Sequence, residues 1–278
     1  GAGAAAMACA KLFRSNGIPK NNIKMLDSKG VINKKRRDIN TWKKEFAVDT
    51  KDKSLDDAMK NADVFLGLSA ANVVKKSMVK KMAKNPIIFA CANPDPEIKP
   101  EDIEEVRDDA IIATGRSDYP NQVNNVLGFP YIFRGALDVR AAAINIDMKV
   151  AATKALADLA KQDVPDEVAN AYSGQHIKFG PEYIIPKPFD ARLLTAIPPA
   201  VAKAAEDSGV ARKPIKDELG YRRRLAARLD KTATLIQSVA DTVKASPKKI
   251  VFAEGEQETV IRAAVQFYKE GYGTPILV

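Results

Sequence analysis

The first six residues constrain the fold of this chain more than any other stretch. Gly1-Ala2-Gly3-Ala4-Ala5-Ala6 fits the pattern G-x-G-x-x-A, which is typical of a dinucleotide-binding turn. In such a turn the first glycine permits a tight bend and the second lets a pyrophosphate approach the backbone. The third small residue lets the next helix pack on a sheet, and free N–H groups at that helix start attract phosphate. Alanine–glycine runs also occur as tags or linkers, so the context must decide.

The residues after the turn favour the nucleotide interpretation. Residues 7–13 are predicted to form a helix that ends at Gly17, and residues 23–26 are predicted to form a strand. Asp27 then stands about 20 residues beyond the glycines, where a ribose-binding carboxylate is expected. Such a turn normally follows a buried strand, and none precedes Gly1, so we expect the sequence to be part of a longer chain. The apolar run at residues 275–278, which stops where a strand would begin, leads to the same expectation.

The composition is that of an ordinary soluble globular protein with one or two domains, at 46% hydrophobic and 28% charged residues. No apolar run is long enough to span a membrane, and no secretory signal is visible. Cys9 and Cys91 are too few for a disulfide framework or a closed zinc site, which favours buried thiols and a cytoplasmic location. The single histidine, His176, lies in a loop marked by glycine and proline, so we expect a surface residue and no transition-metal site.

The net charge of +9 leaves several functions open. The basic clusters at residues 34–37 and 222–224 are not interleaved with aromatic side chains, which make up only 6% of the chain. A surface for single-stranded nucleic acid would need such aromatic residues. Solvated surface is therefore the preferred interpretation, with anion binding second and no nucleic-acid partner expected.

Strands and helices alternate through the first part of the chain. Helices are predicted over residues 40–48 and 73–83, with a short one between them that Ser54 and Asp57 begin as a capping pair. Continuous apolar runs predict buried parallel strands at residues 63–68, 86–92 and 110–114. This alternation predicts an α/β fold, a doubly wound parallel sheet of the Rossmann-like kind. Ser69, Asn93 and Gly115 follow the three strands, at the sheet edge where ligands bind.

A long polar loop follows the third strand, over residues 115–130. It contains the amide side chains Asn121, Gln122, Asn124 and Asn125. Amides offer donors and acceptors without charge, which suits a carboxylate or carboxamide ligand. Asparagine also favours turns, so a surface loop without a ligand explains the same residues equally well.

The chain then becomes helical, which predicts a helical C-terminal extension over residues 131–144, 147–161 and 193–206. Ser208-Gly209 marks a boundary, and a charged helix is predicted from about residue 216 to 245. A new strand–helix pattern starts at Lys249 and predicts the beginning of a second α/β domain. We therefore expect a first domain at residues 1–208, a linker at 209–247 and the start of a further domain at 248–278.

Several of these stretches together resemble the malic enzymes, and most closely the large bacterial hybrid type that carries a phosphotransacetylase-like domain. The resemblance covers about residues 1–208 and is carried by Gly1 to Ala6 and by residues 26–32, 65–69, 92–97, 113–130 and 133–140. The stretch Ala113-Thr114-Gly115-Arg116-Ser117 and its continuation to Pro130 are the most specific. The short segment from Lys249 resembles the first strand and helix of the phosphotransacetylase-like part.

The resemblance implies an enzyme that oxidises malate to pyruvate and CO₂, reduces NAD or NADP, uses Mg²⁺ or Mn²⁺, and forms a homo-oligomer. In the family the catalytic lysine and tyrosine and the metal-binding carboxylates precede the glycine turn. No catalytic or metal-binding residue is therefore expected in this chain, and by itself it is expected to be inactive.

The resemblance also assigns binding roles. It implies that Gly1, Ala2, Gly3, Ala4, Ala5 and Ala6 hold the pyrophosphate, that Asp27 meets the adenosine ribose, and that Ser69, Asn93 and Asn124 line the nicotinamide half. Asn93 and Asn125 are expected to contact malate.

The preferred coenzyme stays open. Asp27 favours the free 2′-hydroxyl of NAD, whereas Ser28, Lys29 and the basic run at residues 34–37 suit the 2′-phosphate of NADP. NADP is the coenzyme that we expect. The alternative function is a nucleotide-binding or scaffolding module without chemistry of its own.

Overall fold

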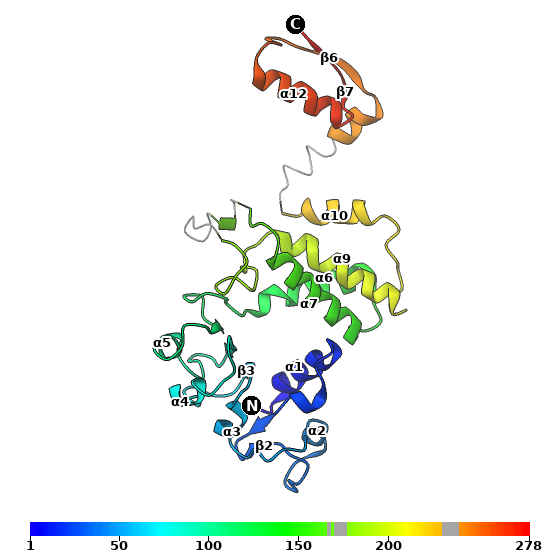
Figure 1. The fold of residues 1–278 in the computed structure, drawn as a ribbon. Coiled ribbons are helices and arrows are strands. Elements are labelled where there is room, and N and C mark those ends of the chain that lie inside the picture. Colours follow the sequence, from blue (N-terminus) through cyan, green and yellow to red (C-terminus); the bar gives the residue numbers. More distant parts are fainter. Residues whose placement is uncertain (166–167, 170–176, 230–238) are drawn as a thin grey trace. The chain divides into compact units, whose positions relative to one another are not determined.

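The computed structural model describes residues 1–165, 168–169, 177–229 and 239–278. His176 and the middle of the predicted helix at residues 216–245 lie outside the described residues. The chain divides into two compact units, Gly1–Lys216 and Asp217–Val278, which we call unit 1 and unit 2 and describe separately (Figure 1).

A parallel sheet of three strands organises unit 1 and agrees with the predicted α/β class. Strands β3 (Val64–Gly67), β4 (Ile87–Ala90) and β5 (Ile111–Thr114) lie in that order, with β4 in the middle. Short helices α3 (Leu55–Met59), α4 (Lys76–Val79) and α5 (Pro100–Glu104) accompany the sheet. Their apolar side chains form a core with β4 around Ile88, Val79 and Ile103, all fully buried. All three strands lie within the apolar runs that predicted them. Each run is short, so each forms a single short strand.

The N-terminal segment of unit 1 is less regular than predicted. Helix α1 (Ala4–Ser15) starts directly after Gly3 and a 3₁₀ turn follows, η1 (Lys20–Asn22). The strand expected at residues 23–26 is reduced to β1 (Leu26–Asp27), which pairs antiparallel with β2 (Gly30–Val31) in a tight hairpin. The helix expected at residues 40–48 is the single turn α2 (Thr41–Lys44).

A layer of helices completes unit 1 and confirms the predicted helical extension. It consists of η2 (Asn125–Leu127), α6 (Phe129–Asp138), α7 (Ile146–Ala160) and α9 (Arg192–Asp207), with α9 packed against both α6 and α7 (Figure 1). Gly135 allows the close approach of α6, because a Cβ there would lie only 2.5 Å from the carbonyl oxygen of Pro198 in α9.

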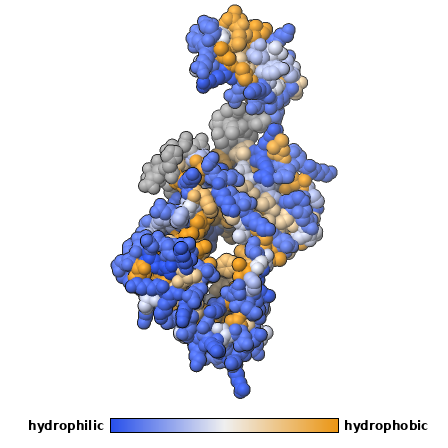
Figure 2. Space-filling model, viewed as in Figure 1, coloured by the Kyte–Doolittle hydropathy of each residue, from blue (hydrophilic) through white to orange (hydrophobic). Residues whose placement is uncertain are grey.

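Unit 2 contains α10 (Glu218–Ala226) and a compact strand–helix–strand motif. In that motif β6 (Lys248–Phe252) and β7 (Gly273–Leu277) pair in parallel, with α12 (Glu258–Lys269) packed against β7. Unit 2 exposes hydrophobic surface among hydrophilic side chains (Figure 2), including Val251, Val265 and Leu277. In the described part of the whole chain, no helix combines the length and the apolar character needed to cross a membrane.

Candidate nucleotide-binding site

The glycine turn packs against the loop that follows β3. A Cβ added to Gly1 would lie 3.1 Å from the Cβ of Ser69 and 3.3 Å from the carbonyl oxygen of Leu68, so a larger residue would crowd this contact. Gly3 is the residue before α1 and has extended backbone angles. Among the described residues other than Gly3 and its two chain neighbours, no atom lies within 4 Å of the place where its Cβ would be. The start of α1 is therefore open, and its first N–H groups are available to an anion.

The ends of the three sheet strands lie at one edge. Because β3, β4 and β5 are parallel neighbours, Ser69, Asn93 and Gly115 follow strands that end on the same side. The loop after β5 turns back to this edge, since the N–H of Val123 donates to the carbonyl oxygen of Thr114 at 2.7 Å. Asn124 and Asn125 come directly after that bond. The three strands thus end on one side of the sheet as predicted, and the end of β3 lies against the glycine turn through Ser69 and Gly1.

The amide-rich loop contains two kinds of residue. Asn121 is buried with its backbone in the left-handed region, and its amide nitrogen donates to the carbonyl oxygens of Ile112 at 2.9 Å and Pro181 at 2.7 Å. Its side-chain oxygen accepts from the N–H of Ile184 at 2.8 Å. Asn121 therefore has a structural role. Asn124 and Asn125 are exposed, although the Asn124 side chain also accepts from the N–H of Val126 at 3.0 Å.

An open groove of about 890 Å³ runs beside these two amides. Its walls come from residues 123–130, from Thr153, Leu156 and Ala157 of α7, and from residues 184–186. Most of these residues are apolar. The polar side chains are those of Asn124 and Asn125, which could orient a ligand there, and that of Thr153, whose hydroxyl donates to the carbonyl oxygen of Lys149.

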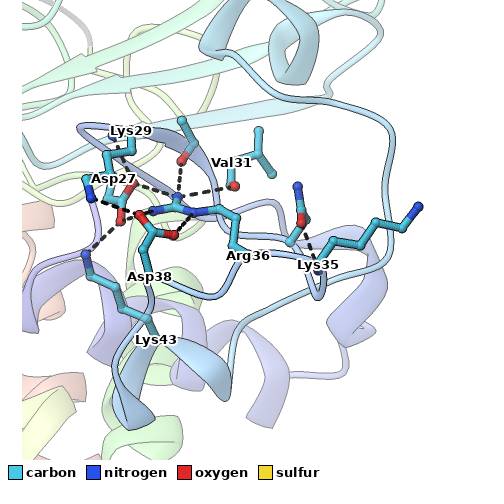
Figure 3. A network of polar contacts seen from close by, with 9 residues as sticks. Asp27, Lys29, Val31, Lys35, Arg36, Asp38 and Lys43 are labelled. Atoms are coloured by element: carbon cyan, nitrogen blue, oxygen red, sulfur yellow. Dashed lines mark hydrogen bonds and ion pairs between the residues drawn. The ribbon is translucent and has the colours of Figure 1, made fainter.

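Asp27 lies inside a network of charges (Figure 3). Its carboxylate accepts from both terminal nitrogens of Arg36, from the ammonium of Lys43 at 2.7 Å and from the N–H of Lys29 at 3.0 Å. The Arg36 side chain holds the pKa of Asp27 far below its usual range, and Lys43 adds to this effect against the opposing influence of burial. Arg36 also bonds Asp38, which pairs with Lys29 at 3.0 Å.

The network surrounds the predicted ribose carboxylate with cations. Each oxygen of Asp27 already receives two donors, so a ribose hydroxyl would have to compete with them. Three cations face two carboxylates in the network, and Lys34, Lys35 and Arg37 are exposed close by in the sequence. The basic run already pointed to Arg36, but Lys43 was missed because it lies 16 residues from Asp27.

A second carboxylate, Glu97, was also missed. Its side chain is fully buried and accepts from the N–H of Ser69 at 2.8 Å and from the N–H of Ala92 at 2.9 Å. Both partners lie at the strand ends that carry predicted binding residues. Nothing in the local sequence distinguishes Glu97 from an exposed loop acid.

Metal and thiol chemistry receive no support at this site. Among the described residues, no group of three or more His, Cys, Asp or Glu side chains could hold a metal ion. Cys9 and Cys91 are free and half-buried. Burial raises the pKa of both thiols, that of Cys91 to about 12 with a further contribution from Glu97.

Comparison with known protein families finds two matches in the chain. The family described as "Malic enzyme, NAD binding domain" matches residues 1–172, and "Phosphate acetyl/butaryl transferase" matches residues 234–278. The chain is 57% identical over 279 residues to the NADP-dependent malic enzyme of Rhizobium meliloti, covering 100% of this chain and 37% of that protein. It is 48% identical over 280 residues to the NAD-dependent malic enzyme of the same organism, covering 100% of this chain and 36% of that protein.

Solved structures show the same similarity. The malic enzyme of Entamoeba histolytica aligns with a TM-score of 0.71 and 34% identity over 86% of this chain and 49% of its own. The enzyme of Pyrococcus horikoshii aligns with a TM-score of 0.69 and 32% identity over 86% of this chain and 54% of its own. The chain thus spans little more than a third of the length of the Rhizobium relatives and about half of these solved chains.

Proposed function

Because the chain belongs to the malic enzyme family, through the NAD-binding domain that matches residues 1–172, we propose that it supplies the cofactor site of an enzyme oxidising malate to pyruvate and CO₂. The observation that carries this proposal is the glycine turn packed on Ser69, with open space at Gly3 before α1. A pyrophosphate fits this arrangement, because backbone N–H groups face the open space and no side chain blocks its approach.

We assign the adenosine and pyrophosphate part of the cofactor to one group of residues and its nicotinamide half to another. Residues Gly1, Ala2, Gly3, Ala4, Ala5 and Ala6 hold the pyrophosphate, and the network around Asp27 receives the adenosine ribose. At the sheet edge Ser69, Asn93 and Asn124 receive the nicotinamide half. Asn93 and Asn125 orient malate, in keeping with the exposure of both side chains. This assignment is supported by the single edge on which these strand ends lie.

The contribution of this chain to the reaction is binding and orientation. When bound, a nicotinamide coenzyme supplies the acceptor for the hydride that leaves the malate carbon. The chain holds that acceptor in place and directs the malate carboxylate through amide hydrogen bonds, which lowers the entropic cost of the encounter. The divalent ion that the family implies does not fit the described residues, which offer no carboxylate cluster, so we derive no step through it.

We propose NADP as the preferred coenzyme. Asp27 is neutralised by Arg36 and Lys43, so its neighbourhood attracts a 2′-phosphate more than its oxygens attract a hydroxyl. The name of the 57% identical relative agrees with this choice, whereas the 48% identical relative is named for NAD.

We also propose the domain division 1–208, 209–247 and 248–278, with the last segment as the opening of a phosphotransacetylase-like domain. The strand–helix–strand motif of unit 2, which begins at Lys248, supports the last boundary, and the family match at residues 234–278 supports the nature of the last segment. A cytoplasmic location is supported by the two free thiols. Homo-oligomerisation rests on the family resemblance, whereas action without a membrane or nucleic-acid partner rests on the length of the apolar runs and the low aromatic content of the sequence.

The decisive experiment adds malate, Mn²⁺ and NADP⁺ or NAD⁺ to the full-length protein and follows nicotinamide reduction by absorbance. Gly3→Val should raise the KM for the coenzyme by about tenfold or more, because the side chain enters space that the pyrophosphate needs. The fold should tolerate this variant, since the space at Gly3 is open. Ala8→Val, on an exposed position of α1, is the matched control. Coenzyme binding without turnover would instead favour the scaffolding function.

A further inference from the structure

We propose that Glu97 is a positioning residue that holds the two nicotinamide-side loops of the cofactor site in one arrangement. This inference rests on the proposed cofactor function, because it takes Ser69 and Asn93 as residues that line the nicotinamide half. Glu97 itself does not contact the coenzyme in this proposal. It acts through the backbone of the two strand ends.

The first observation is the way the carboxylate divides its bonds. Oε1 accepts from the N–H of Ser69 at 2.8 Å and from its hydroxyl at 3.4 Å, while Oε2 accepts from the N–H of Ala92 at 2.9 Å. Ser69 follows β3, and Ala92 immediately precedes Asn93 after β4. One side chain therefore joins the loops of two neighbouring strands through both of its oxygens.

The second observation is that the backbone beside Glu97 reinforces the same connection. The carbonyl oxygen of Glu97 accepts from the N–H of Val74 at 3.0 Å, and that of Pro96 accepts from the N–H of Asn72 at 3.1 Å. The segment after β3 is thus held at Ser69, Asn72 and Val74 by two consecutive residues. The glycine turn in turn rests on Ser69, because Gly1 packs against it.

The third observation is the environment of the carboxylate. It is fully buried, and among the described residues no lysine or arginine forms an ion pair with it. Burying a carboxylate is costly unless hydrogen bonds stabilise it, so the carboxylate favours the arrangement in which the N–H groups of Ser69 and Ala92 point toward it. The raised pKa of the nearby Cys91 thiol, to about 12, has the charge of Glu97 as its second cause after burial.

The carboxylate also lies against the sheet itself. A Cβ added to Gly67 at the end of β3 would be 2.3 Å from the carboxyl carbon of Glu97. Glycine at this position makes room for Glu97 to reach between the two strands. Together these contacts leave the loops little freedom to separate while the carboxylate stays in place.

The test uses the full-length protein and two ligands that share an adenosine half, NADP⁺ and 2′,5′-ADP. Glu97→Gln replaces one carboxylate oxygen with an amide NH₂ group, which cannot accept the hydrogen bond of the facing backbone N–H. Glu97→Asp keeps the negative charge, but its side chain is one methylene shorter and cannot contact both loops. Both variants should weaken NADP⁺ binding by about tenfold, while the dissociation constant of 2′,5′-ADP changes by less than about twofold. Glu104→Gln, on an exposed position of α5, should leave both constants unchanged.

Each outcome decides between the alternatives. Equal weakening of both ligands would show that Glu97 only stabilises the fold, and unchanged NADP⁺ binding would show that it holds neither loop; either result overturns the proposal. Wild-type protein that binds neither ligand would instead contradict the proposed function. If the variants fail to fold, hydrogen exchange on the wild type replaces them. NADP⁺ must then slow exchange at Ser69 and Ala92 more than 2′,5′-ADP does, and equal effects of the two ligands would refute the positioning role.

Discussion

Both terminal nitrogens of Arg36 donate hydrogen bonds to the carboxylate of Asp27, Nη1 to Oδ1 at 2.8 Å and Nη2 to Oδ2 at 3.1 Å. This two-point contact is the strong form of an arginine–carboxylate pair. Asp27, which the sequence predicts to bind a ribose hydroxyl, is therefore already paired with Arg36 and with Lys43. The proposed adenosine end of the site therefore combines the Asp27 carboxylate with two cations that contact it directly, and substitutions can separate their roles.

Asp27→Ala should weaken NAD⁺ binding more than NADP⁺ binding in the full-length protein. Loss of a charge-assisted bond to the ribose costs about 1.5–3 kcal/mol for NAD⁺, whereas Arg36 and Lys43 remain as partners for a 2′-phosphate. Titration of each coenzyme by fluorescence measures the two losses. Equal losses would show that Asp27 does not face the 2′ position.

Arg36→Ala should have the opposite selectivity. Removal of the guanidinium takes a cation from the 2′-phosphate, so NADP⁺ binding should weaken by about tenfold and NAD⁺ binding less. Arg228→Ala, at an exposed position outside the basic run at residues 34–37, is the control and should change neither by more than about twofold. Parallel dissociation constants for the two coenzymes in each variant check the result, and greater loss of NAD⁺ affinity in Arg36→Ala would contradict it.

The same ion pairs make stability depend on pH. Arg36 holds the pKa of Asp27 below that of an unfolded aspartate, which is about 3.9. The stabilisation is therefore fully present above about pH 3.9 and is lost as the pH falls through the lowered folded-state pKa. Denaturant unfolding should show Asp27→Asn to be less stable by about 1.5–3 kcal/mol near neutral pH, with the difference shrinking in acid. A difference that grows below pH 4 would refute this account.

Gly135→Ala should destabilise unit 1, although alanine is the better helix former. The new methyl group would lie 2.5 Å from the Pro198 carbonyl oxygen and 2.9 Å from the Val201 Cβ, so α6 and α9 must move apart. Overpacking of this kind costs about 1–3 kcal/mol, which outweighs the gain of about 1 kcal/mol in helix propensity. Urea unfolding measures the change. Increased stability would mean that the two helices adjust without strain.

Residues 1–278 expressed alone should have no malic enzyme activity. The described residues contain no metal-binding cluster, and the chain spans 37% of the length of a relative that is 57% identical. The assay combines purified chain, malate, Mn²⁺ and each coenzyme and follows absorbance. Turnover that disappears in Asn125→Ala would show that a base and a metal site exist within these residues.

Sequence patterns predicted elements well where local and tertiary preferences agree. The runs at residues 63–68, 86–92 and 110–114 contain β3, β4 and β5, because continuous apolar residues favour a strand. The strands are not all buried as predicted, since β3 lies at the edge of the three-stranded sheet and begins with the exposed Val64. The capping pair Ser54 and Asp57 begins α3 as expected, with both reciprocal bonds present.

Two helix predictions were too long, because backbone N–H groups in these segments donate to carbonyl oxygens that are distant in the sequence and not to those of a helix. The helix expected at residues 73–83 is reduced to α4, since Val74 donates to Glu97 and Ala83 donates to Ala62. The helix expected at residues 40–48 ends after α2, because Val48 pairs with the backbone near Ile32. Such partners are distant in the sequence, and hydrophobic periodicity carries no information about them.

The candidate site shows the same division. The glycine spacing and the positions of the strand ends predicted Gly1, Gly3, Ser69 and Asn93 at one edge of the sheet. Such a prediction is possible because the glycine pattern and the strand ends can each be read from a short stretch of sequence. Glu97 and Lys43 could not be predicted, since their roles come from Ser69, 28 residues away, and Asp27, 16 residues away.

The steric contact between Gly67 and Glu97 has a consequence for the history of the protein. A methyl group at position 67 would occupy the space of the carboxyl carbon, so neither residue can be replaced freely while the other is present. A lineage that acquires a larger residue at position 67 must shorten or lose the acid at position 97. The protein of that lineage then needs another interaction to hold the loop after β3 and the loop after β4 in one relative position. These two positions should therefore vary together among descendants of this gene, although Gly67 ends β3 and Glu97 lies in the loop after β4.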